Sequence, residues 1–247
     1  FDGKKFSSFR KSNGLPTSDI TAVLEDENKN IWIGTTEGLA KFDGISFTSF
    51  KNYGLNHQIN SIYKDSKEII WFCTLGGGIV SFDGKSFKQY TRKEGLITDS
   101  IFCLIQDYDK NYWIGTYHFG VSKITATSFT SGRLKCQTYT KSDGLSSNNI
   151  YCMQEDNQHT IWLGTTNGFL TKYENGKFSP FVISDETKTD FVADILKDSR
   201  NNIWVGTLEH GLIKITNKDY SFYTEAEGLS SHCINYLLED KDKNIWI

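Results

Sequence analysis

The sequence predicts an all-β fold, a β-propeller made of four-stranded antiparallel blades with about 42 residues in each repeat. Three observations predict it. Aromatic residues make up 14% of the 247 residues, and 21 glycines accompany only 2 prolines, which favours strands joined by tight turns. Tryptophan recurs at a nearly constant spacing. Each interval contains four short strand signals, and no stretch shows the spacing of a helix.

The repeat is recognised by three residues that keep a fixed register. The six tryptophans are Trp32, Trp71, Trp113, Trp162, Trp204 and Trp246. An aspartate stands six residues before each of them, at Asp26, Asp65, Asp107, Asp156, Asp198 and Asp240. An apolar residue stands six residues before each aspartate, at Ile20, Ile59, Ile101, Ile150, Val192 and Ile234. Because every tryptophan is used once, the chain is an array of one repeated structural unit.

This register divides residues 1–247 into a single propeller segment with five whole blades and parts of two others. The whole blades are expected at about 10–50, 51–90, 91–140, 141–182 and 183–223, and the partial blades at 1–9 and 224–247. If the two partial blades completed one another, most of one strand would still be missing. We therefore expect a fragment of a larger propeller array.

The first blade shows how the strands are assigned. Strands are predicted at 20–26, 30–36, 38–42 and 46–50, with turn residues such as Asp43-Gly44 between them. Gly38 suits a backbone position with positive φ. Trp32 and Gly34 share one face of their strand, and the glycine is expected to leave room for a bulky neighbour.

Three other blades depart from this pattern. In the second blade, Cys73 stands where the other blades have the glycine of the Trp-x-Gly-Thr motif, and it is expected to be buried. The third repeat is longer, and its additional residues, 127–133, are predicted to extend the outer hairpin. The fifth repeat has residues 184–188 in place of the Gly-Leu of its neighbours.

Composition and motifs exclude several classes of function. The net charge is −3 without a block of Lys or Arg, so we expect no nucleic acid to bind. No apolar run reaches the roughly 18 residues of a membrane span. The motifs of serine hydrolases, zinc peptidases and phosphate-binding loops are absent. Turns such as 26–30 lack the glycine and glutamate of a calcium loop. We therefore expect no catalytic residue, no metal and no cofactor.

The five cysteines do not form a metal-binding or disulfide pattern. None belongs to a CxxC pair, which argues against a zinc site. Cys103 and Cys152 occupy the same register in successive blades, so their side chains point in the same rotational sense and not at each other. We expect no disulfide between them.

A ligand-binding mouth is predicted on one face. In a propeller, the loops that join the second and third strands share a face with the loops that join successive blades. Four of the five histidines fall in these loops, accompanied by Phe119. The candidate ligand-binding residues are Tyr117, His118, Glu209, His210, His57 and His232. Aromatic rings stack on sugars while His and Glu bond hydroxyls, so an oligosaccharide is the predicted ligand. The alternative is that histidine is merely tolerated in exposed loops.

The repeat resembles the two-component regulator propeller repeat. The resemblance rests on Gly14-Leu15, Ile20, Asp26, Trp32-Ile33-Gly34-Thr35, Gly38-Leu39 and Phe42-Asp43-Gly44, with equivalents that include Gly54-Leu55, Gly95-Leu96, Gly144-Leu145 and Gly228-Leu229. It implies a non-catalytic periplasmic sensor region of an inner-membrane hybrid histidine kinase of the Bacteroidetes type. It also implies oligosaccharide recognition, a kinase module in the same polypeptide and a homodimer biased between signalling states.

Two other functions stay open from the residues alone. A metal-dependent propeller lyase or lactonase would need an acid–base set at the mouth, which His118, Glu209 and His210 can supply. A protein-interaction scaffold would need no small ligand. The few carboxylates on the loop face, and the absence of a compact histidine cluster in one repeat, argue against the enzyme.

Overall fold

The computed structural model describes residues 7–130, 133–167, 170–183, 190–216 and 219–247. These residues confirm the all-β prediction, because their regular structure consists of strands and short 3-10 helices. No helix among them is long and apolar enough to cross a membrane. The chain divides into two compact units, residues 1–101 and 102–247, and each is described by itself.

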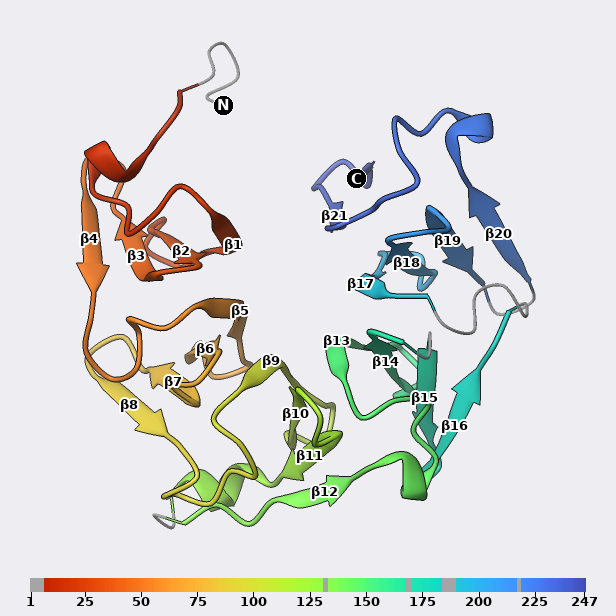
Figure 1. The fold of residues 1–247 in the computed structure, drawn as a ribbon, viewed down its shortest axis with the longest axis horizontal. Helices are drawn as coiled ribbons and strands as arrows, with labels where there is room; N and C mark the ends of the chain where they lie inside the picture. Colours follow the sequence, from red (N-terminus) through yellow and green to blue (C-terminus); the bar gives the residue numbers. More distant parts are fainter. Residues whose placement is uncertain (1–6, 131–132, 168–169, 184–189, 217–218) are drawn as a thin grey trace. The chain divides into compact units, whose positions relative to one another are not determined.

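Residues 1–101 carry two four-stranded antiparallel sheets whose strands follow the order of the chain (Figure 1). The first sheet consists of β1 (Ile20–Glu25), β2 (Ile31–Thr35), β3 (Gly38–Phe42) and β4 (Phe47–Phe50). The second consists of β5 (Ile59–Lys64), β6 (Ile70–Thr74), β7 (Ile79–Phe82) and β8 (Phe87–Tyr90). The 3-10 helix η1 (Lys11–Asn13) precedes β1. The strands predicted for the first blade are confirmed to within one residue at each end.

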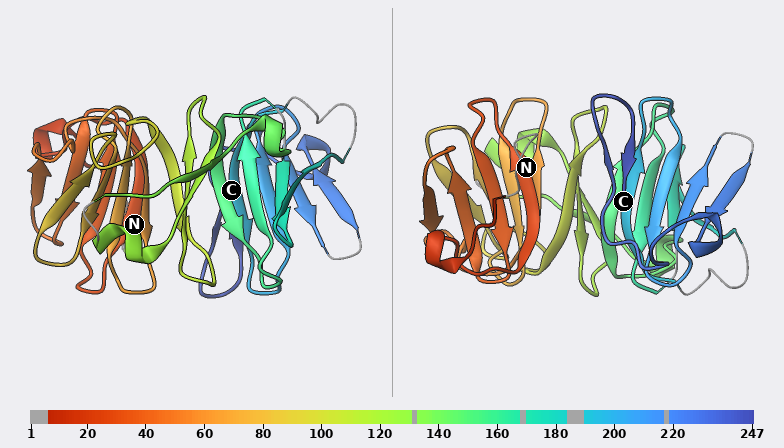
Figure 2. Two further views of the ribbon diagram at one scale, coloured as in Figure 1. Left: turned by 90° about the horizontal axis from the view of Figure 1, so that it is seen from below. Right: turned by 90° about the horizontal axis from the view of Figure 1, so that it is seen from above.

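Three further four-stranded sheets follow, and their antiparallel strands can be traced in the side views of Figure 2. The third sheet consists of β9 (Ile101–Gln106), β10 (Tyr112–Thr116), β11 (Val121–Ile124) and β12 (Gln137–Tyr139). The fourth consists of β13 (Ile150–Glu155), β14 (Ile161–Thr165), β15 (Leu170–Glu174) and β16 (Lys177–Phe181). The fifth consists of β17 (Val192–Lys197), β18 (Ile203–Thr207), β19 (Leu212–Ile215) and β20 (Tyr220–Tyr223). The five sheets agree with the number of whole blades expected.

Shorter elements complete the second unit. The 3-10 helices are η2 (Ala126–Thr130), η3 (Lys141–Asp143) and η5 (Glu225–Glu227). The strands β21 (Leu238–Glu239) and β22 (Ile245–Trp246) pair in a two-stranded sheet, within the segment expected to hold a partial blade.

One hydrogen bond explains the spacing between aspartate and tryptophan. In all six repeats the indole N–H donates to Oδ2 of the aspartate six residues earlier, at 2.8 or 2.9 Å. Oδ1 accepts backbone N–H groups of the same turn, which for Asp26 come from Asn28 and Asn30, both at 2.9 Å. The carboxylate therefore closes the turn between the first two strands, and the calcium-like spacing of these turns reflects that structural role.

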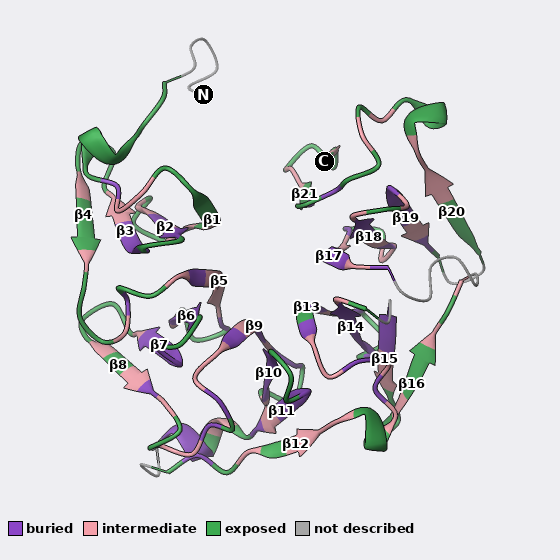
Figure 3. Ribbon diagram, in the orientation of Figure 1, coloured by how far each residue is buried: buried purple, intermediate pink, exposed green. Residues whose placement is uncertain are grey.

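The repeat tryptophans pack between neighbouring blades. Trp32 is 1% exposed, and its ring centroid lies 5.2 to 5.5 Å from those of Phe50, Phe72 and Phe82. Phe72 and Phe82 belong to the second sheet, so this aromatic cluster joins two blades of the first unit. Burial is concentrated in the second and third strands, whereas outer strands such as β4 and β16 are largely exposed (Figure 3).

Gly34 lets the first two blades approach closely. A Cβ atom on Gly34 would lie 2.8 Å from Cγ2 of Ile59, the residue that begins β5. The expectation that this glycine leaves room for a bulky neighbour is confirmed, and the neighbour is Ile59. Cys73 takes the place of the glycine in the second blade and is fully buried, as expected.

Backbone hydrogen bonds join successive blades on the loop side. The glycine before the third strand donates its N–H to a carbonyl in the loop that enters the next blade. The pairs are Gly78 with Asp99 at 2.8 Å, Gly120 with Asn148 at 2.8 Å, and Gly211 with His232 at 2.9 Å. The accepting residue stands two before the apolar residue that opens each repeat, and we call this place the entry position. The six entry positions hold Ser18, His57, Asp99, Asn148, Asp190 and His232.

The outer hairpin predicted at 127–133 is wrong for residues 127–130, which lie in the 3-10 helix η2. The carbonyl of Thr125 accepts the N–H of Ser128 at 2.9 Å and so begins the turn. Phe129 is buried, with its ring centroid 5.0 Å from that of Tyr112 in an edge-on arrangement. This contact holds the segment against the sheet. The expectations for residues 1–6 and 184–188 lie outside the described residues.

Candidate functional site

The strand order confirms which loops carry the candidate histidines. His118 lies between β10 and β11, and His210 lies between β18 and β19. His57 and His232 lie in loops that enter the next blade. His159 lies in the turn between β13 and β14, at the opposite ends of the strands.

Two of these histidines contact other residues of the loops. Nδ1 of His232 lies 3.0 Å from Oε1 of Glu225, and this oxygen also accepts the His232 backbone N–H at 2.9 Å. In the first unit, His57 packs beside two glycines, since a Cβ on Gly77 would lie 3.0 Å from its Cδ2. Both histidines are exposed and contact residues near them in the loops.

Tyr117 and His118 form a close pair of tilted rings in their loop. Their ring centroids are 3.7 Å apart, and the backbone N–H of His118 donates to Oδ1 of Asn149 at 2.8 Å. His118 has φ +70°, a left-handed conformation that a non-glycine residue adopts at some cost. In this loop Tyr117 is 43% exposed.

A row of four aromatic rings runs from this loop across three blades of the second unit. The ring of Tyr117 lies 5.6 Å from that of Phe102 on β9, Phe102 lies 5.1 Å from Tyr151 on β13, and Tyr151 lies 4.7 Å from Phe191 before β17. We call Tyr117, Phe102, Tyr151 and Phe191 the aromatic row. Tyr151 is 37% exposed, so the row offers ring surface and phenol groups to solvent.

Sequence reasoning missed three members of the aromatic row. Phe102 and Tyr151 directly follow the apolar residue that opens their repeats, where other blades have Thr21, Asn60 and Ala193. Aromatic side chains at the same register of two successive blades are the signal that would have revealed it. Within a strand, however, an aromatic residue is also an ordinary β-former.

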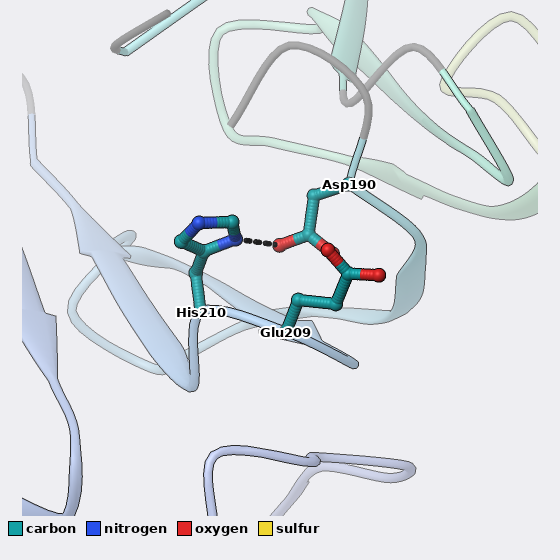
Figure 4. Close-up of side chains that lie close together, drawn as sticks. All are labelled: Asp190, Glu209 and His210. Carbon is teal, nitrogen blue, oxygen red and sulfur yellow. Dashed lines mark hydrogen bonds and ion pairs between the residues drawn. The ribbon is translucent and has the colours of Figure 1, made fainter. Parts of the chain in front are cut away.

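The row ends next to a cluster of two carboxylates and one imidazole. Phe191 follows Asp190, whose Oδ2 lies 2.8 Å from Nδ1 of His210. One ligand atom from each of Asp190, Glu209 and His210 lies within 4.8 Å of the others. Figure 4 shows the carboxylates of Asp190 and Glu209 facing each other beside the ring of His210. These three side chains are the described residues that could hold a metal ion, and Asp190 was not predicted.

The burial of the cluster is uneven. The Asp190 side chain is fully buried, His210 is 29% exposed, and Glu209 is exposed. Thr207 fixes the loop, because its Oγ1 accepts the backbone N–H of His210 at 2.9 Å. The cluster therefore has a buried side at Asp190 and an exposed side at Glu209.

The structure does not bring all the predicted residues into one contact group. Glu209 and His210 gather around Asp190, whereas Tyr117 and His118 contact each other at the other end of the aromatic row. The row connects the two groups within the second unit. Convergence of all four on one ligand stays a prediction.

A polar cleft of about 460 Å³ lies at the other ends of the strands in the second unit. It includes the repeat residues Asp156, Trp162 and Lys172. The first unit has a smaller cleft of about 220 Å³ lined by the equivalent Asp26, Trp32 and Lys41. Because the same parts of the repeat line both clefts, we attribute them to the way that blades pack.

A protein-family model described as a two component regulator propeller matches residues 14–37, 95–118, 144–167 and 188–209. The matches follow the register set by aspartate and tryptophan. The chain carries two-component regulator propeller repeats. This confirms the resemblance found in the sequence.

One curated relative of this chain is histidine kinase P4 from Formosa agariphila, which is 38% identical over 47 residues. Those residues are 19% of this chain and 3% of that protein. The matched part is therefore a small fraction of the relative.

Several solved structures share the fold of this chain. The extracellular domain of the putative hybrid two component system BT3049 from B. thetaiotaomicron matches with a TM-score of 0.65 and 18% identity, over 97% of this chain and 40% of that chain. Virginiamycin B lyase from Staphylococcus aureus with quinupristin matches with a TM-score of 0.66 and 13% identity, over 83% of this chain and 69% of that chain. At these identities the likeness shows the propeller fold.

Proposed function

We propose that this chain is an extracytoplasmic, ligand-sensing propeller of a hybrid two-component signalling protein, and that it binds an oligosaccharide without catalysing a reaction. The repeat family, the histidine kinase relative and the extracellular domain of similar fold support a sensor. The aromatic row is the observation that carries the choice of ligand.

The aromatic row suits a sugar chain better than a compact ligand. Its ring centroids are separated by 4.7 to 5.6 Å, so Tyr117, Phe102, Tyr151 and Phe191 form an extended row of rings in contact. Aromatic faces pack against the apolar faces of sugar rings. The phenol groups can donate to and accept from hydroxyls, and Glu209 adds a carboxylate acceptor at the far end.

The signalling step follows from differential binding. A ligand can bias a receptor only if it binds one conformational state better than another. We propose that the oligosaccharide favours one arrangement of a homodimer and that this arrangement regulates a kinase module in the same polypeptide. The sensor would then lie in the periplasm, with the kinase across the inner membrane.

The binding test uses the purified 247-residue chain. Isothermal titration calorimetry against a panel of oligosaccharides compares the wild type with Tyr117→Ala, Tyr151→Ala and the double variant. Loss of one stacked ring should weaken binding by about two- to tenfold, and loss of both should weaken it further. Tyr220→Ala is the matched control, because Tyr220 is 44% exposed on the outer strand β20.

Thermal unfolding of each variant must accompany the titrations, so that lost binding is distinguished from lost folding. Unchanged affinity in the folded double variant would contradict a site on the aromatic row. Oligosaccharide binding that leaves autophosphorylation of the full-length protein unchanged would contradict the sensor while leaving the binding site intact.

A metal-dependent lyase or lactonase is the second candidate. The cluster of Asp190, Glu209 and His210 is the observation that favours it, because a carboxylate beside an imidazole can act as an acid–base pair. Turnover of a bound oligosaccharide or lactone by the wild type, abolished in His210→Gln, would support this candidate over the sensor.

A further inference from the structure

We propose that Asp190, Glu209 and His210 form a binding site for a divalent first-row transition-metal ion, Zn²⁺ or Mn²⁺. The site requires neither the aromatic row nor the identity of the sensed ligand. It lies wholly in the second unit, and each residue supplies one ligand atom within 4.8 Å of the others.

The buried carboxylate of Asp190 lacks a full set of partners. Oδ2 bonds the imidazole of His210, but Oδ1 is buried and has no hydrogen-bond partner among the residues that the structure describes. Asp190 is 1% exposed, so solvent does not satisfy this oxygen. A buried carboxylate oxygen without a donor is costly, and a bound cation removes that cost.

A comparison with two equivalent entry positions shows that the unpartnered side-chain oxygen is particular to the fifth blade. Oδ1 of Asp99 accepts the backbone N–H of Arg92 at 2.7 Å, and Oδ1 of Asn148 accepts the backbone N–H of Lys141 at 2.8 Å. In both cases the donor stands seven residues earlier. The residue seven before Asp190 is Ile183, and Asp190 makes no corresponding bond to it in the described structure. The carboxylate is thereby available to Glu209 and His210.

The donor set indicates the class of ion. Two carboxylates and one imidazole carry a charge of −2 when the imidazole is neutral, which a dication balances. Carboxylates suit hard cations, and an imidazole favours Zn²⁺ and other transition ions over Ca²⁺, which prefers six to eight oxygens. Three protein ligands leave at least one coordination position open. The exposed side of the cluster, at Glu209, places that position toward solvent.

The experiment measures metal binding alone. The 247-residue chain is freed of metal with a chelator, and Zn²⁺ is titrated by calorimetry. Mn²⁺ binding is followed by loss of the free-ion signal in electron paramagnetic resonance. We expect one ion per chain and an increase in unfolding temperature when the ion is bound. Asp190→Asn, Glu209→Gln and His210→Gln should each weaken binding at least about tenfold.

Two control variants distinguish this site from ordinary surface binding. Asp99→Asn removes the carboxylate at an equivalent entry position, and Glu225→Gln removes the carboxylate of the exposed pair with His232. Both should bind the ion as the wild type does. If Asp190→Asn does not fold, the exposed Glu209→Gln carries the test.

Three results would overturn the proposal. One is the absence of saturable one-to-one binding of both ions. Another is unchanged affinity in the folded cluster variants. The third is a preference for Ca²⁺ over both transition ions. Failure of oligosaccharide binding would not affect it, because no sugar is present in the titration.

Discussion

The indole N–H of Trp113 donates to Oδ2 of Asp107 at 2.8 Å, and both residues are buried. The bond joins the turn after β9 to the centre of a packed aromatic cluster, because the ring of Trp113 lies 4.7 Å from that of Tyr173 in the next blade. One side chain thus anchors its own turn and the interface with the following blade.

Truncation of Trp113 should be strongly destabilising. Trp113→Ala is expected to lower the free energy of unfolding by about 3–5 kcal/mol, because it empties a fully buried site. Trp113→Phe keeps most of the volume but removes a donor from a buried carboxylate, at a cost of about 1–3 kcal/mol. Urea unfolding measures both. Trp246→Phe is the control, since Trp246 makes the same bond but is 62% exposed. Equal losses of unfolding free energy in Trp113→Phe and Trp246→Phe would show that the contribution of this hydrogen bond does not depend on burial.

The close approach of Gly34 and Ile59 should appear as energetic coupling. Gly34→Ala is expected to cost about 1–3 kcal/mol, because the added methyl group meets the Ile59 side chain at 2.8 Å. Ile59→Ala should cost about 2–5 kcal/mol. The double variant should lose about 0.5–3 kcal/mol less than the sum, since the smaller side chain makes room for the new methyl group. If the two losses of unfolding free energy simply add in denaturant unfolding, the side chains at positions 34 and 59 do not restrict each other.

Asp194 should make stability depend on pH. Burial raises the pKa of its carboxyl from 3.8 to about 6, against hydrogen bonds from the Leu237 and Ile195 backbone N–H groups. A raised folded-state pKa gives stability that is present below about 3.8 and lost as the pH rises through about 6. Asp194→Asn should therefore gain stability relative to the wild type above pH 6, by up to about 3 kcal/mol.

Denaturant unfolding on both sides of pH 6 measures this gain. Asp240 is the control, because its pKa is shifted in the opposite direction. Hydrogen bonds from the Asn244 and Trp246 side chains lower its pKa to about 2, so its contribution is lost as the pH falls from 3.8 toward 2. Asp240→Asn should give no gain above pH 6. A constant difference between Asp194→Asn and wild type across pH would refute the titration of Asp194.

The cysteines should differ sharply in reactivity. Burial raises the pKa of Cys73 to about 12 and that of Cys136 to about 11, and burial also raises the pKa of Cys152. Cys233 is exposed. Because the thiolate is the reactive form, iodoacetamide should label Cys233 first in the native protein. Mass spectrometry of the labelled peptides checks the order. Early labelling of Cys73 would mean that the second blade opens readily, and a Cys103–Cys152 disulfide in unreduced protein would contradict their separate directions.

Much of the framework was visible in the sequence because it depends on local, repeated features. The strands of the first blade, the turn at Asp43-Gly44 and the burial of Cys73 follow from residues within one repeat. The prediction for residues 127–130 was wrong because their conformation depends on a tertiary contact. Phe129 packs inward against Tyr112, and the Ser and Thr residues around it do not indicate that contact.

The candidate site was only partly visible for a related reason. Glu209 and His210 share a loop and were predicted together, whereas Asp190 lies twenty residues before His210 and outside the repeated motif. Nothing in its type distinguishes it from Asp99, whose carboxylate is occupied by Arg92. Only the spatial comparison of entry positions reveals the difference.

The backbone hydrogen bonds that the entry-position carbonyls accept have an evolutionary consequence. Gly120 and Gly211 donate to main-chain carbonyls, so the side chain at the accepting residue takes no part in the bond. Asn148 and His232 serve equally well there. A substitution at an entry position can therefore change ligand recognition by one blade while the backbone hydrogen bond to the neighbouring blade is kept. For this reason a newly duplicated blade can diverge in specificity at once.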